Sequence, residues 1–303
     1  MRIIVFIFVF CGHFLMAQHS PIQSQYMFNP IALNPATAGN EDALSIQTSL
    51  RAQWTGFPGA PMTQNLSAHA PLKNENTALG LQLYSDQIGI NRNTGLFGIY
   101  AYKLRFTNSS LSIGLSTGIN FLKSYYSRLD VIDNQDELLF EDSPLGILPD
   151  ASFGLHYSAN KYFITFAIPQ FLSHSFNGTK FQLSNDFSNY NYTLGAGYLH
   201  EFNNGLSLTP SFLTKYRVGL PPQVDINLMA RFNEGITAGL SYRTQEALVA
   251  LFQVNFSNQF SFMYSFGLPV NQFISYTYGS HEIGFKYNFL YKTKISNPRF
   301  LGW

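Results

Sequence analysis

Apolar and polar residues alternate with a period of two along most of this chain of 303 residues. The stretch SSLSIGLSTGINF, residues 109–121, shows the pattern clearly. Its apolar face comprises Leu111, Ile113, Leu115, Thr117, Ile119 and Phe121, and its other face comprises Ser112, Gly114, Ser116, Gly118 and Asn120. Successive residues of a β-strand point to opposite faces, whereas a helix repeats about every 3.6 residues. The pattern therefore predicts strands with one apolar face and one small or polar face.

About fourteen such segments follow one another, each near the roughly ten residues of a tilted membrane-crossing strand. We expect them near residues 43–54, 62–70, 77–86, 95–106, 110–122, 151–159, 162–169, 190–202, 205–217, 223–233, 235–244, 247–257, 260–268 and 281–290.

The connections between these segments alternate between short and long. The short ones, rich in Asn and Gly as hairpin turns are, fall at 107–110, 160–161, 203–205, 233–234 and 258–259. The long ones fall at 55–61, 87–94, 123–150, 170–189, 218–222 and 269–280, while 71–76 and 245–246 depart from the pattern. Outer-membrane barrels sort their connections in this way, with turns in the periplasm and loops outside. An even strand number then puts both termini in the periplasm.

Composition narrows the class of protein. The net charge is +1 and only 12% of residues are charged, so there is no basic excess to bind nucleic acid. No stretch of about 18 apolar residues follows the N-terminus, which excludes transmembrane helices. We therefore predict an all-β fold: an outer-membrane β-barrel of about fourteen antiparallel strands, with a soluble β-protein as the alternative class.

The first 17 residues have the pattern of a secretory signal peptide: Arg2, an apolar core and Ala17 before the expected cleavage site. Cys11, the chain's one cysteine, lies within it, so we expect neither a disulfide nor a cysteine-ligated metal in the mature protein. We expect a motif segment at 18–42, the barrel at 43–290 and a periplasmic tail at 291–303 that is basic and contains no acid.

The segment SQYMFNPIALNPATAG, residues 24–39, contains two Asn-Pro pairs. Asn is a good N-cap and Pro a good first helical residue, so Asn29-Pro30 and Asn34-Pro35 each predict a capped short helical turn. Gly39 would end the second turn. Its apolar residues need cover, so we predict that the segment is a plug in the lumen or against the periplasmic mouth. The apolar residues that need cover are Tyr26, Met27, Phe28, Ile31 and Leu33.

Side chains that could carry chemistry show no pattern that points to catalysis. The histidines lack metal-ligand spacing, no G-x-S-x-G is present, and the acids of DNQDELLFED, residues 133–142, do not match an EF-hand. His281 stands beside Glu282, but neighbouring strand residues point to opposite faces, so we expect no contact. We expect no catalytic residue, cofactor or metal ligand, and a protein that is not an enzyme.

Barrel closure makes the first and last strands neighbours, so loops 55–61 and 269–280 should meet at one outer rim. Both loops are rich in aromatic residues, Gly and Pro. The residues expected at this rim are Trp54, Gly56, Gly59, Pro61, Gly279, Ser280, His281 and Glu282.

Four stretches together resemble the PorP/SprF family of type IX secretion and gliding-motility proteins. They are the segment at 24–39, RAQWTGFPGAPMTQNLSAHAPL at 51–72, GSHEIGFKY at 279–287 and the terminal NPRF at 297–300. Within the first stretch, the family-motif residues are Gln25, Tyr26, Met27, Phe28, Asn29, Pro30, Asn34, Pro35 and Gly39.

The resemblance implies an outer-membrane barrel that assists the export or surface attachment of proteins carrying a C-terminal secretion domain. The implied partners are outer-membrane lipid, type IX secretion components and such a cargo protein. The terminal strand EIGFKYNF, residues 282–289, also resembles the signal read by the barrel-assembly machinery. A transporter or porin for small hydrophobic compounds is the alternative function.

Overall fold

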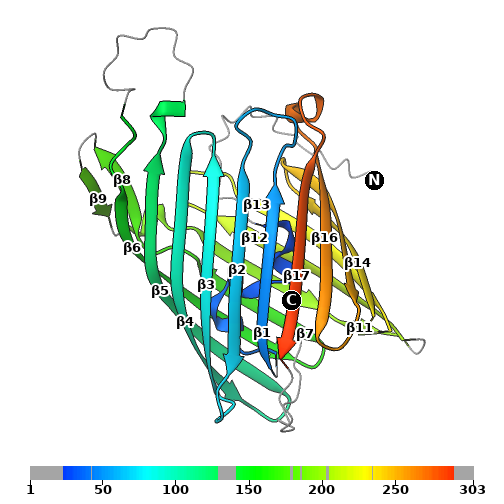
Figure 1. Cartoon of the computed structure of the whole chain (residues 1–303). Coiled ribbons are helices and arrows are strands. Elements are labelled where there is room, and N and C mark those ends of the chain that lie inside the picture. Colours follow the sequence, from blue (N-terminus) through cyan, green and yellow to red (C-terminus); the bar gives the residue numbers. More distant parts are fainter. Residues whose placement is uncertain are drawn as a thin grey trace, which may run out of the picture.

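The protein forms a barrel in the computed structural model (Figure 1). The structure describes residues 23–41, 43–128, 141–177, 180–184, 186–202, 205–233 and 235–289. The expected signal peptide at 1–17 and tail at 291–303 lie outside the described residues, as does most of the acidic stretch in loop 123–150.

One sheet closes on itself, because β1 pairs with β17 and β10 pairs with β12, all pairings being antiparallel. Its strands are β1 (Leu44–Ala52), β2 (Met62–Pro71), β3 (Thr77–Ile88), β4 (Asn91–Arg105), β5 (Ser109–Ser124), β6 (Gly146–Ala159), β7 (Tyr162–Ile168), β10 (Tyr192–Tyr198), β11 (His200–Glu201), β12 (Leu206–Tyr216), β13 (Gln223–Phe232), β14 (Ile236–Arg243), β15 (Ala247–Asn255), β16 (Phe260–Pro269) and β17 (Ser280–Phe289).

Strands β10 and β11 both pair with β12 and occupy one position in the wall. The fifteen strands of the sheet therefore make a closed barrel of fourteen, which confirms the predicted fold class. The sequence pattern missed a separate hairpin of β8 (Ser173–Asn177) and β9 (Lys180–Ser184), within the expected loop 170–189.

The apolar face of each strand points outward and the small polar face points into the lumen. Ile226 on β13 and Leu115 on β5 are 58% and 55% exposed, whereas Ser112 and Asn120 on β5 are buried. Exposed apolar side chains recur around the whole wall. An apolar exterior around a polar interior is what a barrel in lipid requires.

The short and long connections fall at opposite ends, which we call the turn end and the long-loop end (Figure 1). The prediction of a long loop at 87–94 is wrong. Strand β3 runs to Ile88 and β4 starts at Asn91, and only Gly89 and Ile90 connect them. The pairing continues because the backbone ladder does not depend on apolar side chains, and Gly89 supplies the positive φ of the tight turn.

Three 3₁₀-helices precede the barrel: η1 (Ser24–Met27), η2 (Pro30–Ala32) and η3 (Pro35–Thr37). They lie within the barrel, where η1 contacts β16 and β17 and η3 contacts β4, β5 and β6 (Figure 1). Three further short helices of the described residues, η4 (Tyr126–Arg128), η6 (Phe187–Asn189) and η7 (Gln272–Ser275), lie in connections at the long-loop end. No helix in the described part of the chain is long and apolar enough to cross a membrane.

Candidate functional site

The N-terminal segment, residues 23–41, contains the two Asn-Pro turns predicted from the sequence. Asn34 caps η3, because its side-chain oxygen accepts a hydrogen bond of 2.8 Å from the Ala36 nitrogen. Asn29 precedes η2 without capping it, contrary to the prediction. Its amide instead donates to Asn65 Oδ1 and accepts from Ser67 Oγ, both on β2, because the segment lies against the wall there.

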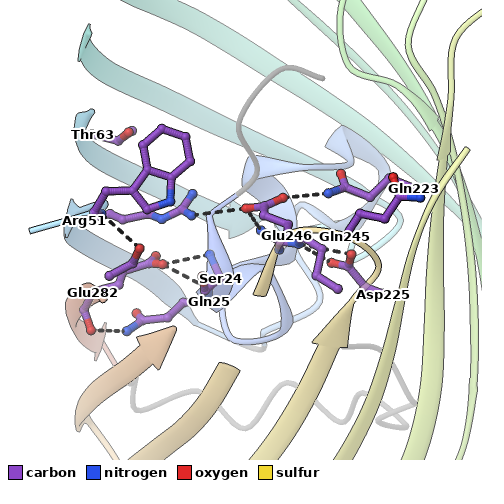
Figure 2. Close-up of polar contacts among 12 residues, drawn as sticks. Ser24, Gln25, Arg51, Thr63, Gln223, Asp225, Gln245, Glu246 and Glu282 are labelled. Carbon is purple, nitrogen blue, oxygen red and sulfur yellow. Dashed lines mark hydrogen bonds and ion pairs between the residues drawn. The ribbon is translucent and has the colours of Figure 1, made fainter. Parts of the chain in front are cut away.

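The first helix is fastened to Glu282 on β17. One carboxylate oxygen, Oε2, accepts from the backbone nitrogens of Ser24 at 2.8 Å and Gln25 at 3.3 Å. The Gln25 side chain donates to the Glu282 backbone oxygen at 2.8 Å (Figure 2). Backbone N–H groups that converge on a carboxylate form charge-assisted bonds, which are stronger than neutral ones.

Glu282 belongs to a group of charged side chains that we call the charged cluster: Arg51, Asp225, Arg243, Glu246 and Glu282. Figure 2 labels Arg51, Asp225, Glu246 and Glu282. Arg51 stands opposite Glu282 across the β1–β17 seam, and its Nη2 atom lies 3.7 Å from Glu246 Oε1. Arg243 donates to both Asp225 oxygens at 3.1 Å and to Glu246 at 3.0 Å. The cluster thus has two guanidinium groups and three carboxylates, and the charge of Lys215 also acts on Glu246 and Asp225. With Lys215 counted, positive and negative charges are equal in number, as buried charges require.

Glu246 lies in the connection between β14 and β15, outside the strands. Burial alone would raise the pKa of its carboxyl, but Arg243, Arg51 and Lys215 outweigh that effect and lower the pKa to about 2. Tyr26 is almost fully buried within the barrel. Its phenol oxygen accepts a hydrogen bond of 2.8 Å from the Asn227 side chain on β13.

The apolar residues of the N-terminal segment are covered, as the sequence predicted. Tyr26, Met27 and Leu33 pack in one cluster that Leu213, Val249 and Leu251 of the wall complete. Ile31 and Ala38 pack in a second cluster with Ala78, Ile99 and Ala101. Two patches of the otherwise polar lumen wall are therefore apolar where the segment contacts them.

The second half of the segment fits against glycines. The Asn34 amide donates to the Leu155 and Phe166 oxygens at 3.0 and 3.2 Å and to Thr165 Oγ1 at 2.6 Å. Gly114 on β5 and Gly154 on β6 pair directly, and a Cβ on either would overlap Ala36 or Asn34. We call Asn34, Gly114 and Gly154 the glycine cradle. Gly114 is needed because the Pro35–Ala36 backbone lies directly against it, and Gly154 because the Asn34 side-chain amide does.

The segment reaches the turn end of the barrel at residues 39–41. The Gly39 nitrogen donates to His69 Nδ1 at 3.1 Å, and Gly39 has the positive φ of +73° expected of a residue that ends a helical turn. Lys103 donates to Asn40 at 3.0 Å, and Lys286 forms an ion pair with Glu41. The segment is thus fixed to three strands before β1 begins.

A cavity of about 300 Å³ lies between the N-terminal segment and the barrel wall. The segment contributes Tyr26, Leu33 and Pro35, while Tyr84 and Asp150 are among the residues that the wall contributes. Most of the wall residues lie toward the long-loop ends of their strands. The lumen is therefore not completely filled on that side.

The rim loops meet at the β1–β17 seam, as predicted. The Thr55 nitrogen donates to the Gly279 oxygen and the Tyr278 nitrogen to the Thr55 oxygen, each at 2.8 Å. Trp54 stacks on Phe273 with ring centroids 4.7 Å apart. Gly56 has φ +91° and lies under the Tyr278 ring, so no side chain fits there.

The remaining expected rim residues divide into two groups. Gly59, with φ +72°, accepts from the Gly89 nitrogen, and the Pro61 oxygen accepts from Gln53, so both lie in the rim. Ser280, His281 and Glu282 belong to β17 instead, because the ladder with β16 continues to Ser280. As expected, His281 and Glu282 point apart: His281 contacts Tyr264 and Glu282 faces the lumen.

Sequence reasoning did not identify Arg51, Asp225, Arg243 and Glu246 as parts of the site. The three that lie in strands occupy polar-face positions, which is the signal that could have found them. Their partners come from distant strands, and only the barrel register brings them together. Among the described residues, no group of three or more His, Cys, Asp or Glu is placed to hold a metal ion.

Comparison with known proteins gives one family and a set of similar folds. The sequence model of the family described as "Type IX secretion system membrane protein PorP/SprF" matches residues 15–287. No curated protein matches the chain.

Three solved barrels have similar folds. The toluene transporter TodX of P. putida has a TM-score of 0.53 at 10% identity, covering 87% of this chain and 94% of its own. The CymD monoaromatic hydrocarbon channel has a TM-score of 0.52 at 14% identity, and the match covers 90% of this chain and 94% of CymD. The Ralstonia pickettii toluene transporter TbuX has a TM-score of 0.52 at 12% identity, and the match covers 89% of this chain and 94% of TbuX. At these identities the likeness shows the fold alone.

Proposed function

The chain belongs to the PorP/SprF family of type IX secretion system membrane proteins, and from that premise we propose that it is a protein-binding component of this system in the outer membrane. In this role it assists the export or surface attachment of proteins that carry a C-terminal secretion domain. The family match over most of the chain carries the proposal. It assigns no chemical reaction to the barrel.

The aromatic rim supports a contact with another protein. Around the Trp54–Phe273 stack, Phe57, Tyr276 and Tyr278 are exposed, Tyr278 to 83%. Aromatic residues are enriched in the cores of protein interfaces, and a contiguous exposed apolar patch marks an interaction site. The rim is also held in place by the seam hydrogen bonds, so the patch is preorganised. We assign the cargo or secretion-component contact to this rim.

The N-terminal segment supports a closed lumen. Glu282 holds it near the long-loop end, the glycine cradle holds its second half, and residues 39–41 hold it at the turn end. We propose that the segment is a plug and that the barrel does not work as an open pore. The proposal also includes export by the signal peptide at 1–17 and insertion by the barrel-assembly machinery through the terminal strand.

The test is deletion of the gene followed by proteomics of the culture medium and the cell surface. We expect selective loss of surface or secreted proteins that carry a C-terminal secretion domain. Complementation with a Trp54→Ala/Phe273→Ala variant should fail to restore them although the barrel still assembles. A Leu240→Ala variant, altered on the outer apolar face, should restore them. Unchanged surface and secreted proteins after deletion would contradict the proposal.

Passage of small hydrophobic compounds is the second candidate. Its support is the barrel fold shared with TodX, CymD and TbuX together with the cavity between the N-terminal segment and the barrel wall. The same deletion strain separates the two candidates. Impaired growth or uptake on hydrophobic solutes, with surface proteins intact, would favour transport over secretion.

A further inference from the structure

Charged side chains are almost absent from the lipid-facing side of the barrel wall. Residues of each strand alternate between the lumen and the lipid, and the exposed apolar residues identify the lipid-facing positions. In the wall strands that the structure describes, two of the Asp, Glu, Lys and Arg residues occupy such positions: Arg92 on β4 and Lys123 on β5. This side of the described strands therefore has two cations and no carboxylate.

Arg92 and Lys123 are direct neighbours. The register of β4 and β5 places them opposite each other, close to the long-loop end of both strands (Figure 1). Directly opposite residues have Cβ atoms about 4.5–5.5 Å apart, and like charges at such positions are destabilising. An anion held between the two cations would remove this repulsion.

A third cation joins the pair from the connection after β5. The Arg128 guanidinium carbon lies 4.3 Å from the centre of the Tyr125 ring, and the Lys123 ammonium nitrogen lies 5.1 Å from it. Tyr125 is itself fixed, because its backbone nitrogen donates to the Ile90 oxygen at 3.0 Å. We call Arg92, Lys123 and Arg128 the cationic patch. The Tyr125 ring keeps two of its cations close together.

The cationic patch has few anionic partners among the described residues. Asp142 Oδ2 lies 3.7 Å from Lys123 Nζ, while Oδ1 of the same carboxylate accepts from the Ser127 nitrogen and hydroxyl. Arg92 donates from Nε to Ser85 Oγ at 3.2 Å, and this partner is neutral. One described carboxylate thus pairs with a patch of three cations, and the patch stays positive.

The two wall cations lie just beyond the apolar band of the barrel. Leu96 and Phe121 are the last apolar residues on the lipid-facing sides of β4 and β5 before Arg92 and Lys123. Leu96 is 45% exposed, and the four residues from it to Arg92 cover about 13 Å of strand. Lipid headgroups occupy the region immediately beyond the hydrocarbon core. The patch therefore lies at the level of the headgroups, next to apolar wall that acyl chains cover.

We propose that the cationic patch binds a phosphate group of a phosphorylated lipid in the leaflet that the long loops face. Arg and Lys form charge-assisted hydrogen bonds with phosphate, and a guanidinium offers two parallel donors. The acyl chains of such a lipid also cover Leu96, a contact that a soluble phosphate lacks. The bound lipid links β4 and β5 to η4 at the membrane surface. The inference does not rest on the proposed secretion function, because it follows from register and charge.

Native mass spectrometry of the detergent-solubilised barrel tests the proposal, with diphosphorylated lipid A as the probe. Arg92→Gln/Lys123→Gln removes both wall cations and keeps polar side chains in their place. Lys73→Gln/Lys161→Gln is the matched control, since it removes two exposed cations from turns at the other end of the barrel. Dephosphorylated lipid A and inorganic phosphate are the comparison probes. Heat-modifiable migration on gels verifies that each variant is folded.

We expect the wild type and the control to bind diphosphorylated lipid A equally. The Arg92→Gln/Lys123→Gln variant should bind it roughly thirtyfold more weakly, about fivefold for each charge removed. Dephosphorylated lipid A should bind weakly and without distinguishing the variants. In vesicles of zwitterionic lipid alone, the Arg92→Gln/Lys123→Gln variant should unfold at the same urea concentration as the wild type, which separates lost lipid binding from lost stability.

Two results would overturn the proposal. Equal binding of diphosphorylated lipid A by the two double variants would mean that the wall cations do not recognise its phosphate. Binding of inorganic phosphate as tight as that of diphosphorylated lipid A, and equally dependent on Arg92 and Lys123, would assign the patch to a soluble anion instead of a lipid.

Discussion

The charged cluster and the glycine cradle hold the same segment by different physical means. At the long-loop end, the buried Glu282 carboxylate binds the backbone of η1, and the other members of the charged cluster form ion pairs with one another. In the second half of the segment, η3 lies directly on β5 and β6. It is held there by hydrogen bonds from the neutral Asn34 amide and by the space that Gly114 and Gly154 leave. The first attachment depends on charge balance and the second on shape, so they should respond to different perturbations.

The difference also bears on which attachment can be released. A steric fit is lost only if the segment is displaced. A charged attachment weakens when one partner is neutralised or pairs with another group. The charged cluster lies below the rim where we place the partner contact. If the plug opens, we therefore expect η1 to leave first and the glycine cradle to stay occupied.

The largest expected effect comes from Arg243→Ala. It leaves Asp225 and Glu246 without their shared cation, and removing one partner of a buried pair costs about 3–5 kcal/mol. Urea-induced unfolding of the purified barrel in lipid vesicles measures the loss. Arg92→Ala is the matched control, since Arg92 is exposed and binds only Ser85 Oγ among the contacts described. A loss no greater than that of the control would mean that the charged cluster adds no stability.

Gly114→Val tests the glycine cradle. Its new side chain would overlap the backbone of Pro35 and Ala36, and overpacking of this kind costs about 1–3 kcal/mol. We expect η3 to be displaced and residues 24–41 to become sensitive to added protease. Gly98→Val on β4 is the control, because a Cβ there meets one backbone oxygen at 3.9 Å. Equal protease resistance in both variants would show that the close approach is not needed.

Asn34→Ala should have a smaller effect. It removes a helix cap and three side-chain bonds to β6 and β7, and loss of such a cap typically costs about 0.5–2 kcal/mol. Asn29→Ala, which lies before η2 but caps nothing, should cost less in the same urea experiment. If the two variants were equally unstable, the difference between the two Asn-Pro turns would have no energetic meaning.

The smallest effect is a pH dependence confined to the charged cluster. The pKa of Glu246 is lowered to about 2, so its stabilising contribution is complete above the unfolded pKa of about 4.3 and is lost as the pH falls through about 2. Stability measured from pH 7 to pH 3 should therefore fall below about pH 4.5 in the wild type. The fall should be shallower in Glu246→Gln, whereas Gly114→Val should retain the wild-type slope. An identical slope in Glu246→Gln would assign the pH dependence to other groups.

The fold followed closely from the sequence because a barrel in lipid needs apolar side chains outside and polar ones inside, and these alternate along each strand. Alternation with an apolar exterior placed all fourteen wall strands, and the Asn-Pro pairs predicted the two turns. The β3–β4 loop was misjudged, because polar residues such as Gln87 and Arg92 continue the ladder beyond the apolar band. The β8–β9 hairpin was missed within a loop that shows no clear alternation.

The site was only partly predictable. The motif residues and the meeting of the rim loops could be inferred from local pattern and barrel closure. The charged cluster could not, because Arg51, Arg243 and Glu282 look like ordinary polar-face residues until register brings them together. Neither could the glycine cradle, since Gly114 and Gly154 resemble the other strand glycines until η3 is placed against them.

The central claim is that the N-terminal segment closes the barrel, and ion conductance in planar lipid bilayers tests it most directly. The wild-type protein should show no steady conductance, and a Glu282→Gln/Gly114→Val double variant, weakened at both attachments, should conduct. The double variant must still migrate as a folded barrel before heating. Steady conductance of the wild type equal to that of the double variant would contradict the claim and leave an open pore in its place.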